Sequence, residues 1–184
     1  MKILLYGFKS YNHWKKNITE SVVEKVSDNK DIVKVVFPLR LNKRIFLKKI
    51  KETMPDLIIG LGQHENGDKF RIERKAINVK RKNLKSEPTY LSKTKPHHYF
   101  LSMILDEDSD SWHSYNAGDN VSNYSMYIIS HFCKNIKFAF INIPKNTDLN
   151  KTATFVERKI KESEKKFMPK GEQSSLKSFV KSKK

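Results

Sequence analysis

Apolar and polar residues follow two different periods in successive blocks of the chain. Short, nearly continuous apolar runs are typical of strands that are buried on both faces of a parallel sheet. Four such runs cover residues 2–7, 31–38, 57–60 and 138–143. Apolar residues at helical spacing predict helices over residues 17–27, 43–53, 122–132 and 152–167. The alternation of these elements predicts an α/β fold: a single three-layer domain with a twisted, mostly parallel sheet and helices on both faces.

The middle of the chain gives weaker signals. Residues 61–68 are polar and hold two glycines, which predicts a loop, and residues 70–79 are strand-like. Residues 80–96 are basic and predict a further loop. Residues 99–105 predict a helix, and residues 112–115 predict a strand.

Helix caps and the chain's end set the expected boundaries. Asn17 or Thr19 is expected to cap the first helix, and Thr152 to lie near the start of the last one. Residues 169–184 are rich in Lys and Ser with few apolar residues, which predicts a basic, disordered tail. The folded domain is therefore expected to span residues 1–168.

The composition narrows the class of protein. With 184 residues, of which 38% are hydrophobic, the chain can bury one core. No apolar run approaches the roughly 20 residues that span a bilayer, and the first residues lack the features of a signal peptide. We therefore expect a cytoplasmic protein without membrane contact. The single cysteine, Cys133, excludes an intrachain disulfide, and its apolar neighbours predict a buried structural thiol.

The net charge of +17 admits two interpretations. Clustered cations attract phosphate backbones, so a nucleic acid or another anion is one candidate partner. Lysine, however, far outnumbers arginine, and such a blend also arises from biased base composition. The basic residues are scattered in short runs, and none is interleaved with aromatic residues suited to base stacking. Both interpretations stay open.

Four separated stretches carry a recurring set of glycine, polar and aromatic residues. They are Gly7-Phe8-Lys9-Ser10-Tyr11 with Asn17; Gly62-Gln63 with Glu73-Arg74-Lys75-Ala76-Ile77-Asn78; Ala117-Gly118 followed by Ser122-Asn123 and Tyr127; and Phe140-Ile141-Asn142-Ile143-Pro144. In this order and spacing they resemble motifs of the pyroglutamyl (pyrrolidone-carboxylate) peptidase family. The family patterns are Gly-Phe-x-Pro-Phe-Gly-Gly with Asn-Pro, Gly-Gln with Glu-Arg-x-Ala-x-Asn, Ala-Gly-x-x-x-Cys-Asn-x-x-x-Tyr, and Phe-Ile-His-Val-Pro. The first stretch lacks both prolines and the paired glycines of the family pattern.

The resemblance implies a catalytic triad of Cys, His and Glu that removes N-terminal pyroglutamate from peptides. In such a site the thiolate attacks, the histidine moves the proton and the carboxylate orients the histidine. Carried over by position, the nucleophile is Ser122, the base is Asn142 and the orienting acid is Glu73. Asparagine cannot accept and return a proton at neutral pH, and serine depends more than cysteine on an adjacent base. We therefore expect activity to be impaired or lost.

The expected ligand site is less altered than the triad. The resemblance implies that Phe8 and Tyr11 sandwich the pyroglutamate ring, with Asn17 and Gln63 as nearby polar residues. The alternative is that both aromatic residues belong to the core. The expected ligand is a peptide N-terminus or a small lactam-like molecule, without a metal or cofactor. The resemblance also implies self-association into dimers or tetramers.

Two other functions remain as alternatives. One is a binding protein whose basic surface takes an anion or nucleic acid. The other is a serine-type hydrolase in which Ser122 uses a recruited histidine. His64 follows Gln63 and is the first candidate, although an exposed loop histidine is the simpler interpretation. His131 lies nine residues after Ser122, which is half a turn out of phase, so it should point away.

Overall fold

A six-stranded sheet forms the centre of the molecule in the computed structural model, which describes residues 1–10, 17–81 and 85–167. The strand order is β2-β1-β3-β10-β4-β9. The strands are β1 (Ile3–Phe8), β2 (Ile32–Phe37), β3 (Leu57–His64), β4 (Phe70–Glu73), β9 (Ser111–Ser114) and β10 (Lys137–Pro144). All neighbours run parallel except β10 and β4, which run antiparallel. The mostly parallel sheet is therefore confirmed.

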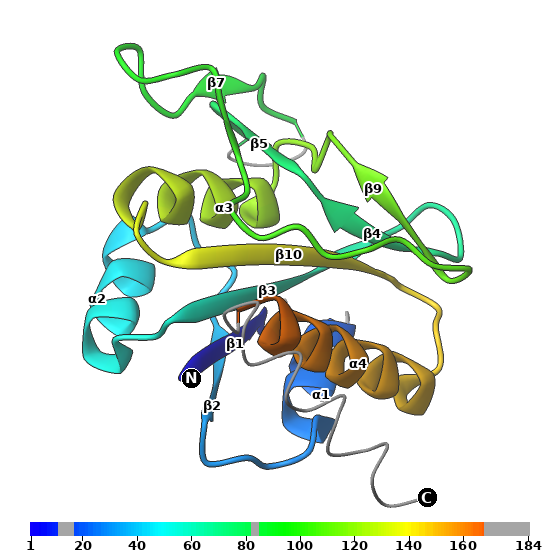
Figure 1. The fold of residues 1–184 in the computed structure, drawn as a ribbon. Helices are drawn as coiled ribbons and strands as arrows, with labels where there is room; N and C mark the ends of the chain where they lie inside the picture. The colour runs from blue at the N-terminus through cyan, green and yellow to red at the C-terminus, as the bar shows by residue number, and fades with distance from the viewer. Residues whose placement is uncertain (11–16, 82–84, 168–184) are drawn as a thin grey trace, which may run out of the picture.

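Helices cover both faces of this sheet (Figure 1). Helices α1 (Ile18–Lys25) and α4 (Leu149–Phe167) pack on one face, against side chains such as Leu5 and Ile59. Helices α2 (Lys43–Thr53) and α3 (Val121–Phe132) pack on the other, against residues such as Tyr6. Neighbouring residues of each strand point to opposite faces, so both sides of a central strand are apolar. This arrangement confirms the predicted three-layer domain.

A smaller part of the chain projects beyond α3, at the top of Figure 1. It contains two short antiparallel sheets, in which β5 pairs with β8 and β6 with β7. The strands are β5 (Lys75–Ile77), β6 (Val79–Lys80), β7 (Thr89–Tyr90) and β8 (His98–Phe100). The expected strand over residues 70–79 is thus divided among β4, β5 and β6. The expected basic loop, residues 80–96, holds β7.

Three expected boundaries were wrong. Residues 61–64 continue β3 instead of forming a loop, because β10 pairs with that strand as far as His64. Residues 99–105 are not helical: Leu101 donates its backbone N–H to Arg74 O, and Met103 donates to Phe138 O. The last helix begins at Leu149, so Thr152 lies inside it, where its hydroxyl donates to Asp148 O at 2.7 Å.

Side-chain caps fix the starts of the other helices. The Asn17 side chain accepts from Thr19 N at 3.1 Å, which confirms one of the two expected caps. Asn42 and Asn120 cap α2 and α3 in the same way. Cys133 ends α3 as a half-buried thiol whose pKa is raised by burial. The expected tail, residues 169–184, lies outside the described residues.

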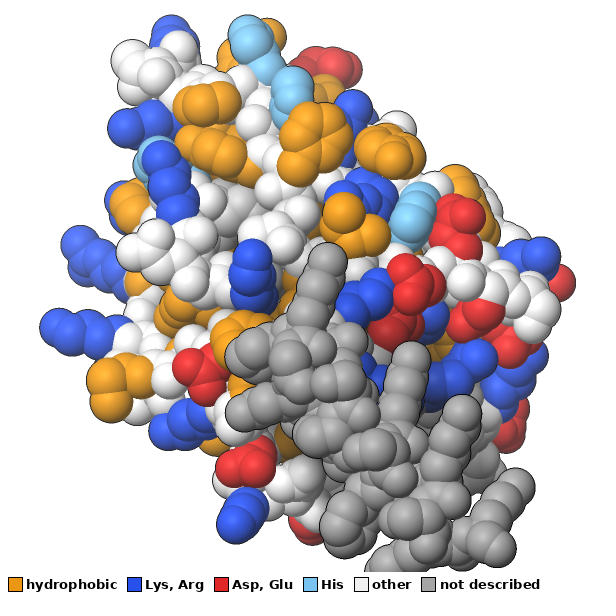
Figure 2. Space-filling model, viewed as in Figure 1, with side chains coloured by type: hydrophobic (Ala, Val, Ile, Leu, Met, Phe, Trp, Pro, Cys, Tyr) orange, Lys and Arg blue, Asp and Glu red, His pale blue; other side chains and the backbone are white. Residues whose placement is uncertain are grey.

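Lys and Arg side chains are spread over the face seen in Figure 2 and do not form one continuous patch there. Within the described part of the chain, every helix is too short or too polar to cross a bilayer.

Candidate functional site

A buried polar cluster lies where β3 and β10 approach the beginning of α3. Ser122 is the second residue of α3 and is 3% exposed. Asn142 belongs to β10 and Glu73 ends β4, and both side chains are buried. The fold therefore brings together three residues that are up to 69 positions apart in sequence. They are the three positions that the resemblance assigned to the triad.

Gly62 makes room for the cluster. It pairs with Asn142 in the parallel register of β3 and β10. A Cβ atom at Gly62 would lie 2.1 Å from Asn142 Oδ1 and 2.5 Å from Ser122 Oγ. Both oxygens therefore converge on the same point, and their separation is at most the sum of these two distances. Only glycine leaves this space open.

The side-chain amide of Asn142 lies between the hydroxyl and the carboxylate. Asn142 Nδ2 donates to Glu73 Oε1 at 2.7 Å. An ionised carboxylate only accepts hydrogen bonds, so this contact fixes the amide orientation and turns Oδ1 towards Gly62 and Ser122. Among the described residues, neither Asn142 Oδ1 nor Glu73 Oε2 has a hydrogen-bond partner. The cluster thus contains a buried acceptor that is available to a ligand N–H.

Burial raises the pKa of Glu73. The Asn142 amide, the Ser114 hydroxyl and the charge of Arg71 act in the opposite direction but are weaker together. Desolvation disfavours the charged carboxylate, as expected for a side chain that is 1% exposed. The carboxyl is therefore easier to protonate than a surface glutamate.

Two asparagines hold the beginning of α3 in place. Asn120 Oδ1 accepts from the backbone N–H of Ser122 at 2.9 Å and of Asn123 at 3.3 Å. The fully buried Asn123 side chain accepts from Ile77 N and donates to Ile77 O and Val79 O, each at 2.9 Å. The first amides of α3 are therefore already bound to the cap, while Asn123 ties the helix to β5 and β6.

Asn120 is the residue of this site that sequence reasoning missed. The signal was present, because asparagine directly before a helical stretch is a common N-cap. Our expectation placed the helix start at Ser122, one residue late, and assigned Asn120 to no element.

The expected ligand-binding residues fall into two groups. Gln63 Oε1 accepts from Ile18 N at 3.0 Å, so Gln63 and the cap residue Asn17 meet at the beginning of α1. Phe8 is 1% exposed and packs edge-on against Tyr6 with ring centroids 5.8 Å apart. In the described part of the site Phe8 is therefore a core residue. Tyr11 lies outside the described residues.

His64 is not the exposed loop histidine that we expected. It ends β3, is 9% exposed, and its Nε2 lies 3.1 Å from Lys69 O. Burial, followed by the charge of Arg71, lowers its pKa, and the backbone of Lys69 and Asn66 opposes this effect. Arg71 itself donates to Asn66 O at 2.6 Å. The imidazole therefore packs within the 64–71 turn.

His131 points away from Ser122, as its helical phase predicted. Its Nδ1 lies 2.6 Å from the Tyr99 hydroxyl on the outer side of α3. Within residues 1–10, 17–81 and 85–167 no imidazole is hydrogen-bonded to Ser122. Over the same residues, no three His, Cys, Asp or Glu side chains are grouped so as to hold a metal ion.

The fold and the cluster together have a recognisable layout. The molecule is a three-layer α/β domain whose buried hydroxyl, amide and carboxylate stand in series beside a helix N-terminus. A hydrolytic triad has the same order of groups, with a base in the middle position where this chain has an amide.

The family follows from comparison with known sequences. The family model described as pyroglutamyl peptidase matches residues 1–154, so the chain belongs to the pyroglutamyl peptidase family. Pyrrolidone-carboxylate peptidase 2 of Caldanaerobacter subterraneus subsp. tengcongensis is 31% identical over 170 residues, which cover 78% of this chain and 81% of the relative. The Finegoldia magna pyrrolidone-carboxylate peptidase is 28% identical over 167 residues, 78% of either chain.

Solved structures support the fold. A mutant pyrrolidone carboxyl peptidase from Pyrococcus furiosus superposes with a TM-score of 0.80 at 21% identity, over 91% of this chain and 100% of the other. The Thermococcus litoralis pyrrolidone carboxyl peptidase gives a TM-score of 0.77 at 20% identity, over 88% and 92%. At these identities the structural likeness concerns the fold.

Proposed function

We propose that this chain binds a peptide N-terminus or a small lactam-like ligand at the Ser122–Asn142–Glu73 cluster, and that its ability to hydrolyse such a ligand is impaired. The family supports the ligand class, since its named relatives are pyrrolidone-carboxylate peptidases. The observation that carries the proposal is the position of Asn142, which donates to Glu73 and leaves a buried oxygen without a donor.

The chemistry of the three groups favours binding over cleavage. A serine hydroxyl needs a base to become a nucleophile. The side chain between Ser122 and Glu73 is that of Asn142, a neutral amide. The Asn142 oxygen accepts a hydrogen bond but does not take a proton at neutral pH. It is well suited to the N–H of a lactam ring, because a buried acceptor without a partner is costly and gains from a donor. Asn142 would thus bind the ligand, whereas a histidine at the same position would transfer a proton during its hydrolysis.

The test measures hydrolysis and binding separately on the wild-type protein. A fluorogenic pyroglutamyl amide reports cleavage, and isothermal titration with a short pyroglutamyl peptide reports binding. We expect binding without turnover above the buffer rate. Asn142→Ala should weaken binding, since it removes the acceptor; Ser130→Ala, at the other end of α3, is the matched control. Turnover at the rate of an ordinary peptidase, abolished by Ser122→Ala, would reject the impaired-activity proposal. Absence of binding would reject the ligand.

A basic-surface function is a second candidate, and one observation favours it: two adjoining cavities in the projecting part of the chain are lined by lysines and an exposed aromatic ring. None of Ser122, Asn142 and Glu73 lines either cavity.

A further inference from the structure

Positive charge is concentrated in the segment that projects beyond α3. Residues 74–97 contain eight Lys or Arg residues and a single acidic residue, Glu87. This short part of the chain therefore carries seven of the seventeen net positive charges. At the upper end of Figure 2, basic, histidine and hydrophobic side chains adjoin one another, with an acidic side chain among them. Our expectation that no basic run adjoins an aromatic residue suited to base stacking was wrong here, because Tyr90 lines one cavity together with Lys93 and Lys95.

Two adjoining cavities open in this segment. The first has a volume of about 270 Å³ and is lined by Asn78, Tyr90, Ser92, Lys93, Lys95 and His97. The second has a volume of about 510 Å³ and is lined by Val79, Pro88, Thr89, Tyr90 and Lys93. Tyr90 and Lys93 line both cavities, so the two share a wall and together make up one hollow. Its size falls within the range of roughly 300–1,000 Å³ that small-molecule sites occupy.

Asn78 fixes the walls of this hollow. Its side chain is 2% exposed and donates to Ser92 O at 2.7 Å and to Lys95 O at 3.3 Å. Its Oδ1 accepts from Ser92 N at 2.9 Å, and its own backbone N–H donates to His97 O at 2.8 Å. One buried side chain thus holds the 92–97 loop against β6. Because this loop is already ordered without a ligand, it loses less conformational entropy when a ligand binds.

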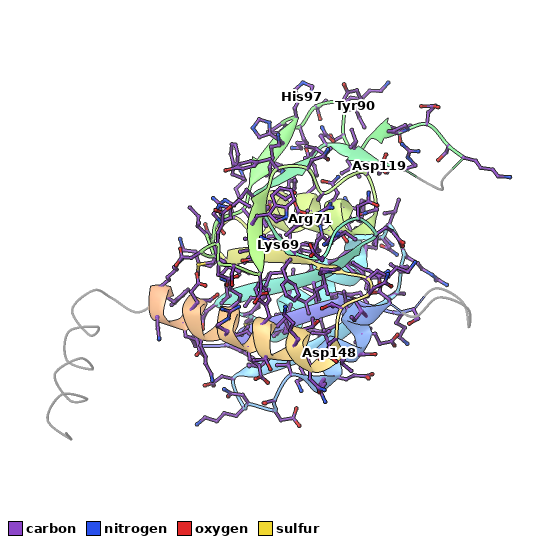
Figure 3. The ribbon with its side chains drawn as sticks, turned by 90° about the vertical axis from the view of Figure 1, so that its right-hand side faces the viewer. Lys69, Arg71, Tyr90, His97, Asp119 and Asp148 are labelled. Atoms are coloured by element: carbon purple, nitrogen blue, oxygen red, sulfur yellow. The ribbon has the colours of Figure 1, made fainter. Side chains whose placement is uncertain are left out.

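The lining of the hollow includes an exposed ring and two exposed cations. Tyr90 is 58% exposed, and its ring meets His97 edge-on with centroids 6.0 Å apart and an interplanar angle of 66°. Figure 3 shows these two residues side by side at the outer end of the molecule. Lys93 and Lys95 are exposed, and the described part of the chain offers neither of them an ion-pair partner. Glu87 precedes the lining residue Pro88 in sequence and is the one acidic residue of the 74–97 segment.

We propose that this hollow binds a nucleotide unit, with the phosphate at Lys93 and Lys95 and the base stacked on Tyr90. The unit is either a free nucleotide or part of a single-stranded nucleic acid, which share this chemistry. Lysine ammonium groups bind phosphate as point charges, and stacking on an aromatic ring tolerates any base. The carboxylates of an acidic peptide would bind the two lysines but would not stack on the exposed Tyr90 ring. The hollow is independent of the Ser122 cluster.

The test is fluorescence anisotropy of the full chain with a labelled short oligouridylate. Lys93→Gln/Lys95→Gln should weaken binding by about 10-fold and lower the salt slope by roughly one unit, since each phosphate contact on a single strand contributes about 0.7. Tyr90→Ala should weaken binding about 10-fold with little change in slope, because stacking is not ionic. Tyr90→Phe should bind like the wild type. Lys30→Gln/Lys51→Gln removes the same charge from two exposed sites elsewhere and is the matched control.

Competitors distinguish the source of the nucleotide. Displacement by uridine monophosphate, but not by inorganic phosphate, indicates a free nucleotide, whereas displacement only by unlabelled oligouridylate indicates a single strand. Equal loss in the control pair, or unchanged binding by Tyr90→Ala, would overturn the proposal in favour of unspecific charge attraction. Displacement by polyglutamate as strong as by oligouridylate would overturn it in favour of an acidic peptide. Displacement by a pyroglutamyl peptide would also count against a separate site.

Discussion

In the proposed site the middle side chain, Asn142, is a neutral amide and not a base. If Ser122→Cys and Asn142→His are introduced together, we expect hydrolysis of a pyroglutamyl amide to appear. The thiol would gain a base, and the new histidine would contact Glu73 in place of the Asn142 amide. Each single variant should remain close to the wild type, because the members of a triad act as a unit. The measurement is the initial rate with a fluorogenic substrate for all four proteins.

The same four proteins supply the control. Ser122→Cys alone tests the thiol without a base, and Asn142→His alone tests the base without the thiol. If the double variant binds the pyroglutamyl peptide but cleaves it no faster than either single variant, the cluster lacks a further requirement of catalysis. The cap would then be the first explanation to test. Asn120 already accepts from the backbone N–H groups of Ser122 and Asn123, so these are not available to bind an oxyanion.

The buried carboxyl of Glu73 should make the stability of the folded protein depend on pH. Its folded-state pKa is raised by burial, so between its unfolded and folded pKa values the folded protein holds a proton that the unfolded chain has released. Glu73 therefore costs stability as the pH rises through this window. Glu73→Gln removes the titration while leaving an oxygen for Asn142 Nδ2. We expect the free energy of unfolding of Glu73→Gln, relative to the wild type, to increase from about pH 4 to pH 7.

Urea denaturation at several pH values measures this difference. Glu24→Gln, at an exposed position of α1, is the matched control for loss of a carboxylate. A difference between Glu73→Gln and the wild type that stays constant, or decreases, as the pH rises would contradict the assigned effect of burial.

At the scale of elements, the sequence predicted strands and helices best where one period continued over a whole element. Residues 99–105 show why the middle of the chain was harder. Leu101, Met103 and Leu105 are buried, whereas Phe100 and Ile104 are about half exposed or more. This alternation is the period of an extended chain, but leucine and methionine also favour helices, and we gave that preference too much weight. Seven residues hold too few turns to separate the two patterns.

The candidate site could be predicted only through the resemblance. Glu73, Ser122 and Asn142 meet because β3, β10 and β4 pair in one particular register. A shift of one residue would turn Asn142 to the opposite face of the sheet. The sequence around each of these three residues contains no local pattern that predicts this register. By contrast, helix caps are local features: Asn17 was expected from the sequence, and Asn120 was missed because the helix start was placed one residue late.

The cap of α3 is testable at this scale. Asn120→Ala removes the acceptor of two backbone N–H groups, so we expect a loss of about 1 kcal/mol in the free energy of unfolding. Asn120→Asp keeps an acceptor and adds a negative charge at the positive end of the helix, so it should be as stable as the wild type or more stable. Chemical denaturation of both variants measures the effect. Equal destabilisation by Asp and Ala would show that Asn120 does not act as a cap.

At the scale of the whole molecule, a buried lysine, Lys159, links helix α4 to the edge of the sheet. Lys159 is 3% exposed, and its Nζ lies 3.2 Å from Asp108 Oδ2 and 3.1 Å from Glu162 Oε2. The same ammonium group lies 5.5 Å from the centre of the Phe155 ring, which stacks on Phe70 of β4. A cation is thus buried where acidic residues of the 106–110 segment meet α4, and it joins that helix to the edge of the sheet.

Removing this cation should therefore loosen α4 more than removing an exposed one. Breaking a buried pair commonly costs about 3–5 kcal/mol, because the partner keeps an uncompensated charge. Asp108 and Glu162 remain partly exposed and also contact Arg158 and Lys166, respectively, so we expect about 2 kcal/mol for Lys159→Met. Lys161→Met removes an exposed lysine from the same helix and should change stability by less than about 0.5 kcal/mol. Urea denaturation of both variants compares them, and hydrogen exchange should show faster opening of α4 in Lys159→Met alone. If the two variants are equally stable, the buried lysine is replaceable by apolar packing, and α4 is held by its hydrophobic face.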